Sequence, residues 1–274
     1  MPYKGASQKK YPSEKFHSFQ FFKYQSFLLH TPYNYPILFY GRARNRSIVL
    51  ITKHLKENGY VTCYSGEACK KDNTRTLHNL NTIKCLYGKQ NIEHLYEYGG
   101  QFWRKYKENR KFLSIVSNDG HEGTLEVLKY ADNTIFNFLN NLFNENLLKD
   151  SSIILVSDHG VGMPSIYYPY DFYILEEQLP MLYIIINDRK NISYEEQYKY
   201  INENQQTLIS SYDIYNTIGN LIFGDDYKNI QNKTEDKDTP KSQYGKSLFE
   251  KINQKIRTPK FYENVGIMAD YICK

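Results

Sequence analysis

Two short apolar runs on either side of a long amphipathic stretch constrain the fold of this chain most. Residues 112–116 read FLSIV and residues 153–156 read IILV, and short apolar runs with β-branched residues are typical of buried strands. Between the two runs, apolar residues recur at helical spacing from Val127 to Leu142. Strand, helix and strand make a βαβ unit, whose crossover we expect to be right-handed. The sequence therefore predicts an α/β fold.

Each of these two strands ends in a cluster of acidic residues and histidine. Asp119, His121 and Glu122 follow the first strand, and Asp158 and His159 follow the second. In such sheets the working groups lie just beyond the carboxyl ends of the strands, so neighbouring strands would place both clusters in one crevice. Imidazole and carboxylate together suit zinc, manganese or iron. A polar turn that caps a following helix would explain one pair, but two clusters favour a metal or catalytic site.

The segment SDHGVGMP, which contains Asp158 and His159, resembles the SDHG motif of the alkaline phosphatase superfamily. DGHEGT, which contains Asp119 and His121, resembles the partner motif of the sulfatase-like branch that is known as a domain of unknown function. The resemblance implies a mostly parallel sheet sandwiched by helices. It also implies one or two divalent metal ions, zinc or manganese rather than calcium, one held by Asp158 and His159 and the other by Asp119 and His121.

The segment HTPYNYPILFYG carries a further part of the resemblance. Thr31 stands ten positions before Gly41, as the nucleophile of the superfamily does at a helix start, and Asn34 stands where some members carry a possible substrate contact. A hydroxyl beside a metal loses its proton more easily, and a helix N-terminus favours an incoming anion. Thr31 would also serve as an ordinary N-cap before Pro32. Thr31 and His159 favour phosphate over sulfate esters, because sulfatases usually carry Asp-Asn and a Cys or Ser nucleophile.

Two ligands that the superfamily usually supplies are missing from the sequence. No apolar strand ending in Asp precedes Thr31, and no histidine follows His159. We therefore expect a chain truncated at its N-terminus that lacks the first strand of the fold. Residues 1–15 would be a flexible segment, and residues 16–274 a single partial domain.

The expected function is a metal-dependent hydrolase or transferase that acts on phosphate or sulfate esters, in a truncated or inactive form. The alternative is a catalytically dead domain of the same fold that binds a metal or a partner. Whether the chain is an enzyme depends on the two missing ligands, since the loss of a ligand weakens a metal site severely. The oligomeric state is left open.

Composition limits the partners of this chain. The net charge of +5 is spread along the 274 residues. A mildly basic chain suits a small anionic ester as substrate, but the sequence contains no recognisable nucleic-acid-binding motif. An aromatic-rich module that binds nucleic acid is the weakest alternative. No apolar run is long enough to span a membrane, and the first residues do not read as a signal peptide. The resemblance nevertheless implies a secreted, lumenal or membrane-anchored protein.

Overall fold

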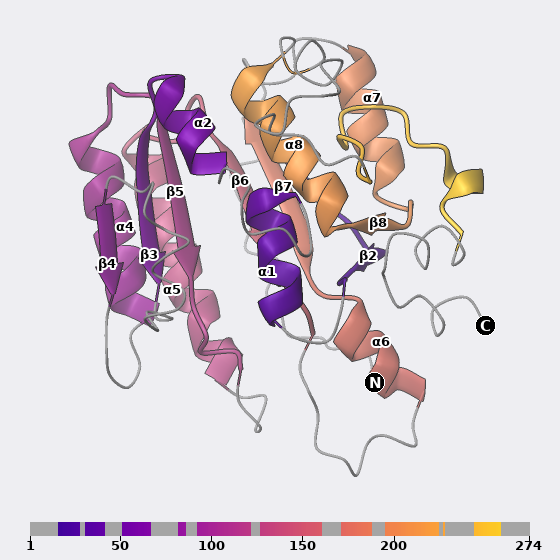
Figure 1. The fold of residues 1–274 in the computed structure, drawn as a ribbon. Helices are drawn as coiled ribbons and strands as arrows, with labels where there is room; N and C mark the ends of the chain where they lie inside the picture. The colour runs from indigo at the N-terminus through magenta and orange to yellow at the C-terminus, as the bar shows by residue number, and fades with distance from the viewer. Residues whose placement is uncertain are drawn as a thin grey trace.

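The computed structural model describes residues 16–27, 31–41, 51–66, 82–85, 92–121, 127–160, 171–187, 195–224, 227 and 244–258. They form an α/β fold in which helices pack around small β-sheets (Figure 1). The strands are β1 (Phe16–Gln20), β2 (Tyr24–Gln25), β3 (Val61–Gly66), β4 (Thr82–Cys85), β5 (Lys111–Val116), β6 (Ser152–Val156), β7 (Leu182–Asn187) and β8 (Ile209–Ser210). The helices are α1 (Thr31–Tyr40), α2 (Ile51–Glu57), α4 (Ile92–Lys105), α5 (Val127–Asn144), α6 (Asp171–Gln178), α7 (Glu195–Asn204) and α8 (Ser211–Phe223), and Gln254–Ile256 forms a short 3-10 helix.

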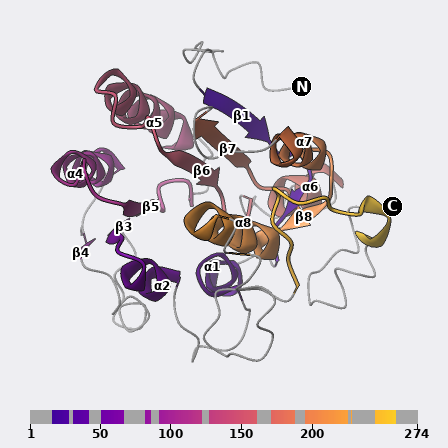
Figure 2. The same cartoon turned by 90° about the horizontal axis from the view of Figure 1, so that it is seen from above.

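Two three-stranded sheets form the centre of the molecule. One has the order β4-β3-β5 with parallel pairing throughout, and the other has the order β1-β7-β6 with antiparallel pairing throughout. Figure 2 shows the six strands one after another in a single row, with α4 and α5 on one side and α1, α2 and α8 on the other. The expected sheet sandwiched by helices is therefore confirmed, although β1 and β6 pair antiparallel to β7.

The strands of the predicted βαβ unit are not hydrogen-bonded neighbours. α5 connects β5 to β6 as the periodicity predicted, but among the described strands β5 is outermost in one sheet and β6 is outermost in the other. A crossover helix returns the chain to the same layer of strands, but it does not fix how many strand positions separate the two strands that it connects. Strands that follow each other in sequence are adjacent in only about two-thirds of cases. The sequence predicted the βαβ unit and left open whether its two strands are neighbours; among the described strands they are not.

The main core lies on β7 and the helices that cover it. Leu182, Ile184 and Ile186 are almost completely buried, and Ile184 pairs with Phe19 of β1 and Ile154 of β6. The β7 residues belong to one cluster with residues of α7, α8 and the segment 248–252. This cluster packs the β1-β7-β6 sheet against its helices and so fixes the positions from which the loops at the strand ends begin.

A buried ion pair fastens the segment 244–257 onto α8. The Asp213 carboxylate is fully buried, and it accepts hydrogen bonds from Nη1 and Nη2 of Arg257 at 3.1 and 2.7 Å. It also accepts from the backbone N–H groups of Ser210, at 2.8 Å, and Lys246, at 2.7 Å. Thr217 Oγ1 accepts from the Leu248 N–H at 2.9 Å. Side chains of α8 therefore supply the partners that this irregular segment lacks in its own backbone.

Buried tyrosine and cysteine side chains make the stability of this fold sensitive to alkaline pH. Burial raises the pKa of the Cys63 thiol to about 11 and that of Tyr96 to about 12. Burial also raises the pKa of three further tyrosines, Tyr24, Tyr35 and Tyr212. Below their ordinary pKa values of 9.0 for cysteine and 10.0 for tyrosine, these groups are protonated whether the chain is folded or not.

Above those values only the unfolded chain ionises, so the free energy of unfolding falls by about 1.4 kcal/mol per pH unit for each group. We expect the urea midpoint to be constant from about pH 7 to pH 8.5 and to fall steeply between about pH 9 and pH 11. The variant Tyr96→Phe removes one titrating group and should show a shallower decline. A midpoint that stays level to about pH 11 would contradict this prediction.

Candidate functional site

The C-terminal end of α6 holds two loops of the site together. The Gly160 N–H donates to the Glu177 carbonyl at 2.8 Å, and the Ser26 N–H donates to the Gln178 carbonyl at 3.0 Å. The last carbonyls of a helix have no partner within it, so they are available for bonds of this kind. One bond fixes the turn that follows β6, and the other fixes the chain shortly before α1. The start of α1 is thereby brought beside the turn after β6.

His159 faces the first residue of α1. Its Nε2 lies 3.1 Å from Thr31 Oγ1, and its Nδ1 lies 2.6 Å from the Gly160 carbonyl oxygen. A carbonyl oxygen only accepts, so in the neutral imidazole Nδ1 carries the proton and Nε2 presents its lone pair. The Thr31 hydroxyl therefore donates to Nε2. Ser157 Oγ also donates to the His159 carbonyl at 2.6 Å, which fixes the backbone of this turn.

Asp158 lies beside the same imidazole. Its Oδ2 is 3.8 Å from His159 Nε2, and this oxygen is buried without a hydrogen-bond partner among the described residues. The pKa values of two buried tyrosines, Tyr24 and Tyr35, are raised. Burial is the main cause for both, and the negative charge of Asp158 raises them further. A buried carboxylate oxygen without a donor is costly. Its position suits a bound cation.

His121, in the turn after β5, also lies near His159. Its ring is exposed and lies 6.1 Å from that of His159 between centroids, at an interplanar angle of 85°. The Asp119 side chain is half-buried, and its backbone N–H donates to Ser117 Oγ at 3.2 Å. Within the described part of the chain, no hydrogen bond or ion pair joins the Asp119 carboxylate to His121, Asp158 or His159. The structure thus brings one residue of each cluster together, and Glu122 lies outside the described residues.

Asn34 lies one turn into α1 and is fully buried. Its Oδ1 accepts a hydrogen bond from the Phe27 N–H at 2.7 Å. This bond ties α1 to the end of the preceding strand region and helps to set the position of Thr31. A contact between Asn34 and a substrate stays a prediction.

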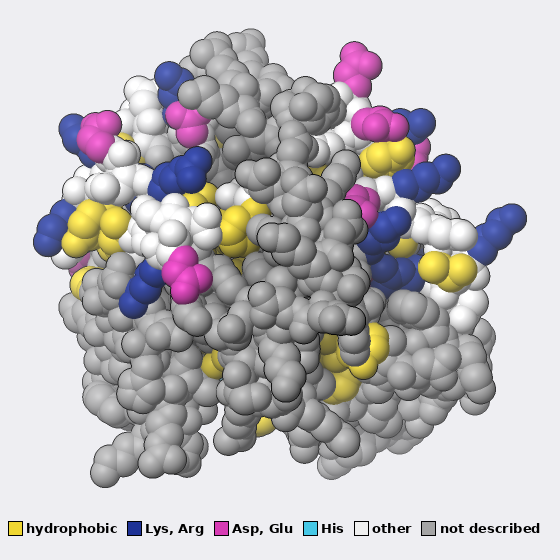
Figure 3. All heavy atoms as spheres, turned by 45° about the horizontal axis from the view of Figure 1, so that its top comes forward, with side chains coloured by type: hydrophobic (Ala, Val, Ile, Leu, Met, Phe, Trp, Pro, Cys, Tyr) yellow, Lys and Arg dark blue, Asp and Glu magenta, His cyan; other side chains and the backbone are white. Residues whose placement is uncertain are grey.

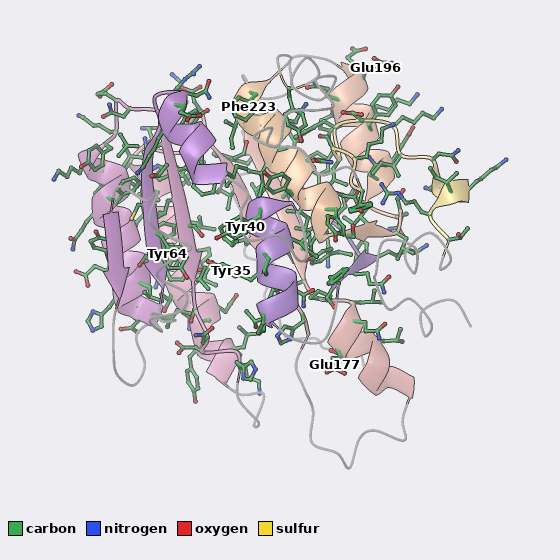
Figure 4. The ribbon with its side chains drawn as sticks, in the orientation of Figure 1. Tyr35, Tyr40, Tyr64, Glu177, Glu196 and Phe223 are labelled. Carbon is green, nitrogen blue, oxygen red and sulfur yellow. The ribbon has the colours of Figure 1, made fainter. Side chains whose placement is uncertain are left out.

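Tyr35 is a member of the site that sequence reasoning missed. It lies four positions after Thr31 on the same helix, and residues at that spacing share one face. Burial and the neighbouring Tyr64 raise its pKa, and Asp158 adds to the rise. Figure 4 labels Tyr35 on α1 and Tyr64 on β3, between the helix and the β4-β3-β5 sheet. The helical spacing from Thr31 was the signal that could have identified Tyr35.

Asp158 and His159 fit a shared metal ion as two of its ligands. Ligand atoms bound to one zinc ion at about 2.0–2.2 Å lie at most about 4.4 Å apart, so a separation of that order is compatible with a shared ion. The 3.8 Å between Asp158 Oδ2 and His159 Nε2 meets this condition. Over the described ranges, however, no three His, Cys, Asp or Glu side chains gather closely enough to hold a metal. Further ligands would have to come from groups beyond this pair.

The charged side chains on the face in Figure 3 are mixed in sign. Lys and Arg alternate with Asp and Glu on both flanks of this view. Elsewhere along the chain, Lys199 pairs with Glu203 and Lys246 with Glu250, each at 3.9 Å. The described side chains of this face therefore form no continuous basic track of the kind that binds nucleic-acid phosphates.

Solved structures share this fold at low sequence identity. The lipoteichoic acid synthase LtaP from Listeria monocytogenes is 14% identical with a TM-score of 0.60, and the match covers 87% of this chain and 68% of that one. A "sulf" protein from a Bacteroides thetaiotaomicron locus for glycosaminoglycan metabolism is 11% identical with a TM-score of 0.57, covering 93% and 75%. The periplasmic domain of EptC from Escherichia coli, in complex with Zn, is 11% identical with a TM-score of 0.51, covering 75% and 71%.

Together with the family match, these shared folds confirm the resemblance to sulfatase-like proteins of the alkaline phosphatase superfamily that the sequence showed. More specifically, the chain belongs to the family "Protein of unknown function (DUF229)", whose profile matches residues 50–271. The matched range contains Asp119, His121, Asp158 and His159, and it begins after Thr31. No curated protein sequence matches the chain. None of the described helices has the length and apolar character that a membrane crossing requires.

Proposed function

We propose that this chain hydrolyses or transfers phosphate or sulfate esters, and that phosphate esters are preferred. The observation that carries the proposal is the 3.1 Å hydrogen bond from the Thr31 hydroxyl to His159 Nε2. The hydrogen bond places the Thr31 hydroxyl at the nitrogen that a metal ion would occupy, and coordination to a metal is one of the ways in which a hydroxyl nucleophile is activated. The proteins that share the fold are described as a lipoteichoic acid synthase and a "sulf" protein, which supports ester chemistry of this class.

A divalent metal, zinc or manganese, would be held by Asp158 and His159, and a second ion by Asp119 and His121. When bound, such a metal supplies Lewis acidity, which lowers the pKa of a neighbouring hydroxyl and stabilises negative charge on the ester. The Nε2 lone pair that accepts the Thr31 hydrogen bond is the one that a metal would use. Thr31 consequently stands directly beside the proposed ion, and the Zn complex of EptC supports this choice of cofactor.

The start of α1 contributes to substrate binding in this proposal. Thr31 is the first residue of the helix, and backbone N–H groups at a helix start have no partner within it. They carry partial positive charge that favours a phosphate group approaching Thr31. The partner of the chain would therefore be a small anionic ester. Because EptC is described as a periplasmic domain, we infer that this chain also acts outside the cytoplasm.

The experiment is an assay of the whole chain with bis(p-nitrophenyl) phosphate and p-nitrophenyl sulfate, with added zinc or manganese and with EDTA. We expect metal-dependent turnover of the phosphate ester, and a loss of at least about 1,000-fold in Thr31→Ala. Thr31→Ser, which keeps the hydroxyl, should retain part of the activity. Thr134→Ala, on α5, is the matched control and should behave like the parent.

A second candidate function is a catalytically dead domain that binds a metal or a partner. The observation in its favour is that no three ligand side chains gather in the described residues. Stoichiometric zinc binding that is lost in Asp158→Ala, together with no turnover of either ester by the parent chain, would establish this alternative and end the hydrolase proposal. Turnover that Thr31→Ala leaves unchanged would equally exclude Thr31 as the nucleophile.

A further inference from the structure

The turn after β6 runs along the short segment that links α6 to β7. At one end of the turn, the Ser157 N–H donates to the Met181 carbonyl at 3.0 Å. At the other end, the Gly160 N–H donates to the Glu177 carbonyl at 2.8 Å. Because both ends of the turn are bonded in this way, the two residues between them lie opposite residues 178–180.

The two residues between these bonds are Asp158 and His159, the proposed metal ligands. The segment opposite them reads Gln-Leu-Pro. Leucine and proline side chains have no atom that can bind a metal, whereas the amide oxygen of glutamine can. Gln178 is therefore the residue of this segment whose side chain can contribute to the site.

Gln178 and Asp158 each present an oxygen atom that lacks a hydrogen bond. Gln178 is 5% exposed, and its Oε1 is buried without a partner among the described residues. The same holds for Asp158 Oδ2. Two acceptor oxygens cannot satisfy each other, because neither carries a proton. A cation that both oxygens contact would remove the cost of burying them.

The backbone of Gln178 is fixed close to the start of α1. Its carbonyl accepts hydrogen bonds from the Ser26 N–H at 3.0 Å and from Ser26 Oγ at 3.5 Å. Ser26 belongs to the chain shortly before α1, which begins at Thr31. Gln178 is thus held between the two loops that bring Thr31 and His159 together.

Glu177 is the competing candidate on the same helix. It is an acidic residue of α6 that is only 6% exposed (Figure 4). With Asp158 and His159 it would make a group of three acidic or histidine side chains. No such group lies within reach of one metal ion in the parts of the chain that the structure describes. This result argues against Glu177 and leaves an amide oxygen as the ligand.

We propose that Gln178 Oε1 is the third ligand of the metal ion that the proposed function places on Asp158 and His159. This role depends on that ion. Amide oxygens act as metal ligands beside carboxylates, and carbonyl oxygens suit manganese. Gln178 would supply the ligand that the sequence lacks before Thr31. Because the amide is neutral, the site binds its metal more weakly than a site with a second carboxylate.

The test is metal binding by the whole chain, which requires no turnover. Manganese binding is followed by the electron paramagnetic resonance signal of the free ion, and zinc binding by competition with a coloured chelator. We expect Gln178→Ala to weaken binding by about tenfold or more. Gln178→Glu keeps the shape of the side chain and should strengthen binding by about tenfold, because the charge of the ligands sets affinity. The matched control is Glu176→Gln, which alters an exposed charge on the same helix and should change affinity by less than about twofold.

A hydrogen bond from the Gln178 amide to Asp158 would also make binding sensitive to Gln178→Ala. Cobalt separates the two roles, because its visible absorption changes when one of its ligands is lost. We expect the cobalt absorption of Gln178→Ala to differ from that of the parent, and that of Glu176→Gln to match it. Weaker binding in Gln178→Ala with unchanged cobalt absorption would contradict the ligand role.

Two further outcomes separate this ligand role from the proposed function. Binding that is lost in Asp158→Ala but unchanged in both Gln178 variants would overturn the role of Gln178 and leave the proposed function standing. Binding that Asp158→Ala leaves unchanged, or no binding of either metal by the parent chain, would overturn the proposed metal site and the role of Gln178 together.

Discussion

Replacing Asp213 with alanine is expected to lower the free energy of unfolding by about 3–5 kcal/mol, the usual result of breaking a buried ion pair. Asp213 is fully buried and Arg257 is 8% exposed, so water cannot replace the lost carboxylate at either end. The substitution also removes the acceptor of the Lys246 N–H. Urea unfolding followed by circular dichroism measures the loss directly.

The control for this prediction is an ion pair of similar geometry on the surface. Arg104 donates to Glu145 from Nε at 2.6 Å and from Nη2 at 2.7 Å, but 44% and 41% of the two side chains are exposed. Water and salt screen such a pair, so Glu145→Ala should lower stability far less than Asp213→Ala. Equal losses in the two variants would show that burial of the Asp213–Arg257 pair has no special importance.

Replacing Gly160 with alanine is expected to disturb both the fold and the candidate site. A Cβ atom at this position would lie 1.7 Å from the Glu176 carbonyl oxygen and 2.8 Å from the Glu177 Cα, both of which belong to the backbone of α6. Neither atom can rotate away, so the turn or the helix must move. We expect a loss of stability of about 1–3 kcal/mol or more. A shift of about 1 Å in His159 would also reduce turnover by about 100-fold.

Gly120 offers a matched control for this substitution. It lies in the turn after β5, and a Cβ there would meet Leu128 Cδ1 at 3.5 Å, an ordinary contact. Gly120→Ala should therefore unfold at nearly the urea concentration of the parent. Urea unfolding and the phosphate ester assay should be run on both variants. A Gly160→Ala protein with the stability of Gly120→Ala would show that α6 does not hold the turn in the way described.

Local patterns in the sequence predicted much of the fold. The helical periodicity from Val127 to Leu142 gave α5, and the apolar runs gave β5 and β6. The rings of His121 and His159 lie 6.1 Å apart between centroids, although β5 and β6 are not paired among the described strands. Strand pairing depends on contacts between distant parts of the chain, and the residues of a strand do not state which strand lies beside it.

The candidate site was only partly predictable for the same reason. Motif resemblance selected Thr31 and His159, whereas their contact depends on α6, which holds two loops through backbone carbonyls that carry no sequence signal. Asp213 and Arg257 are 44 residues apart, and neither stands in a pattern that marks a buried ion pair. The roles of Thr31, Asn34, Asp119, His121, Asp158 and His159 stay predictions until the variants are assayed.

The Asp213–Arg257 pair has a consequence for how the chain folds during synthesis. The carboxylate leaves the ribosome well before its guanidinium partner, because α8 is translated before the segment 244–257. Until Arg257 and Lys246 emerge, α8 cannot bury Asp213 without a large desolvation cost. Helix α8, which packs next to β7 and α1, therefore stays incompletely packed while the rest of the chain is being synthesised. Such intermediates expose apolar surface. A nascent chain of this protein should engage chaperones until the last of these residues is released.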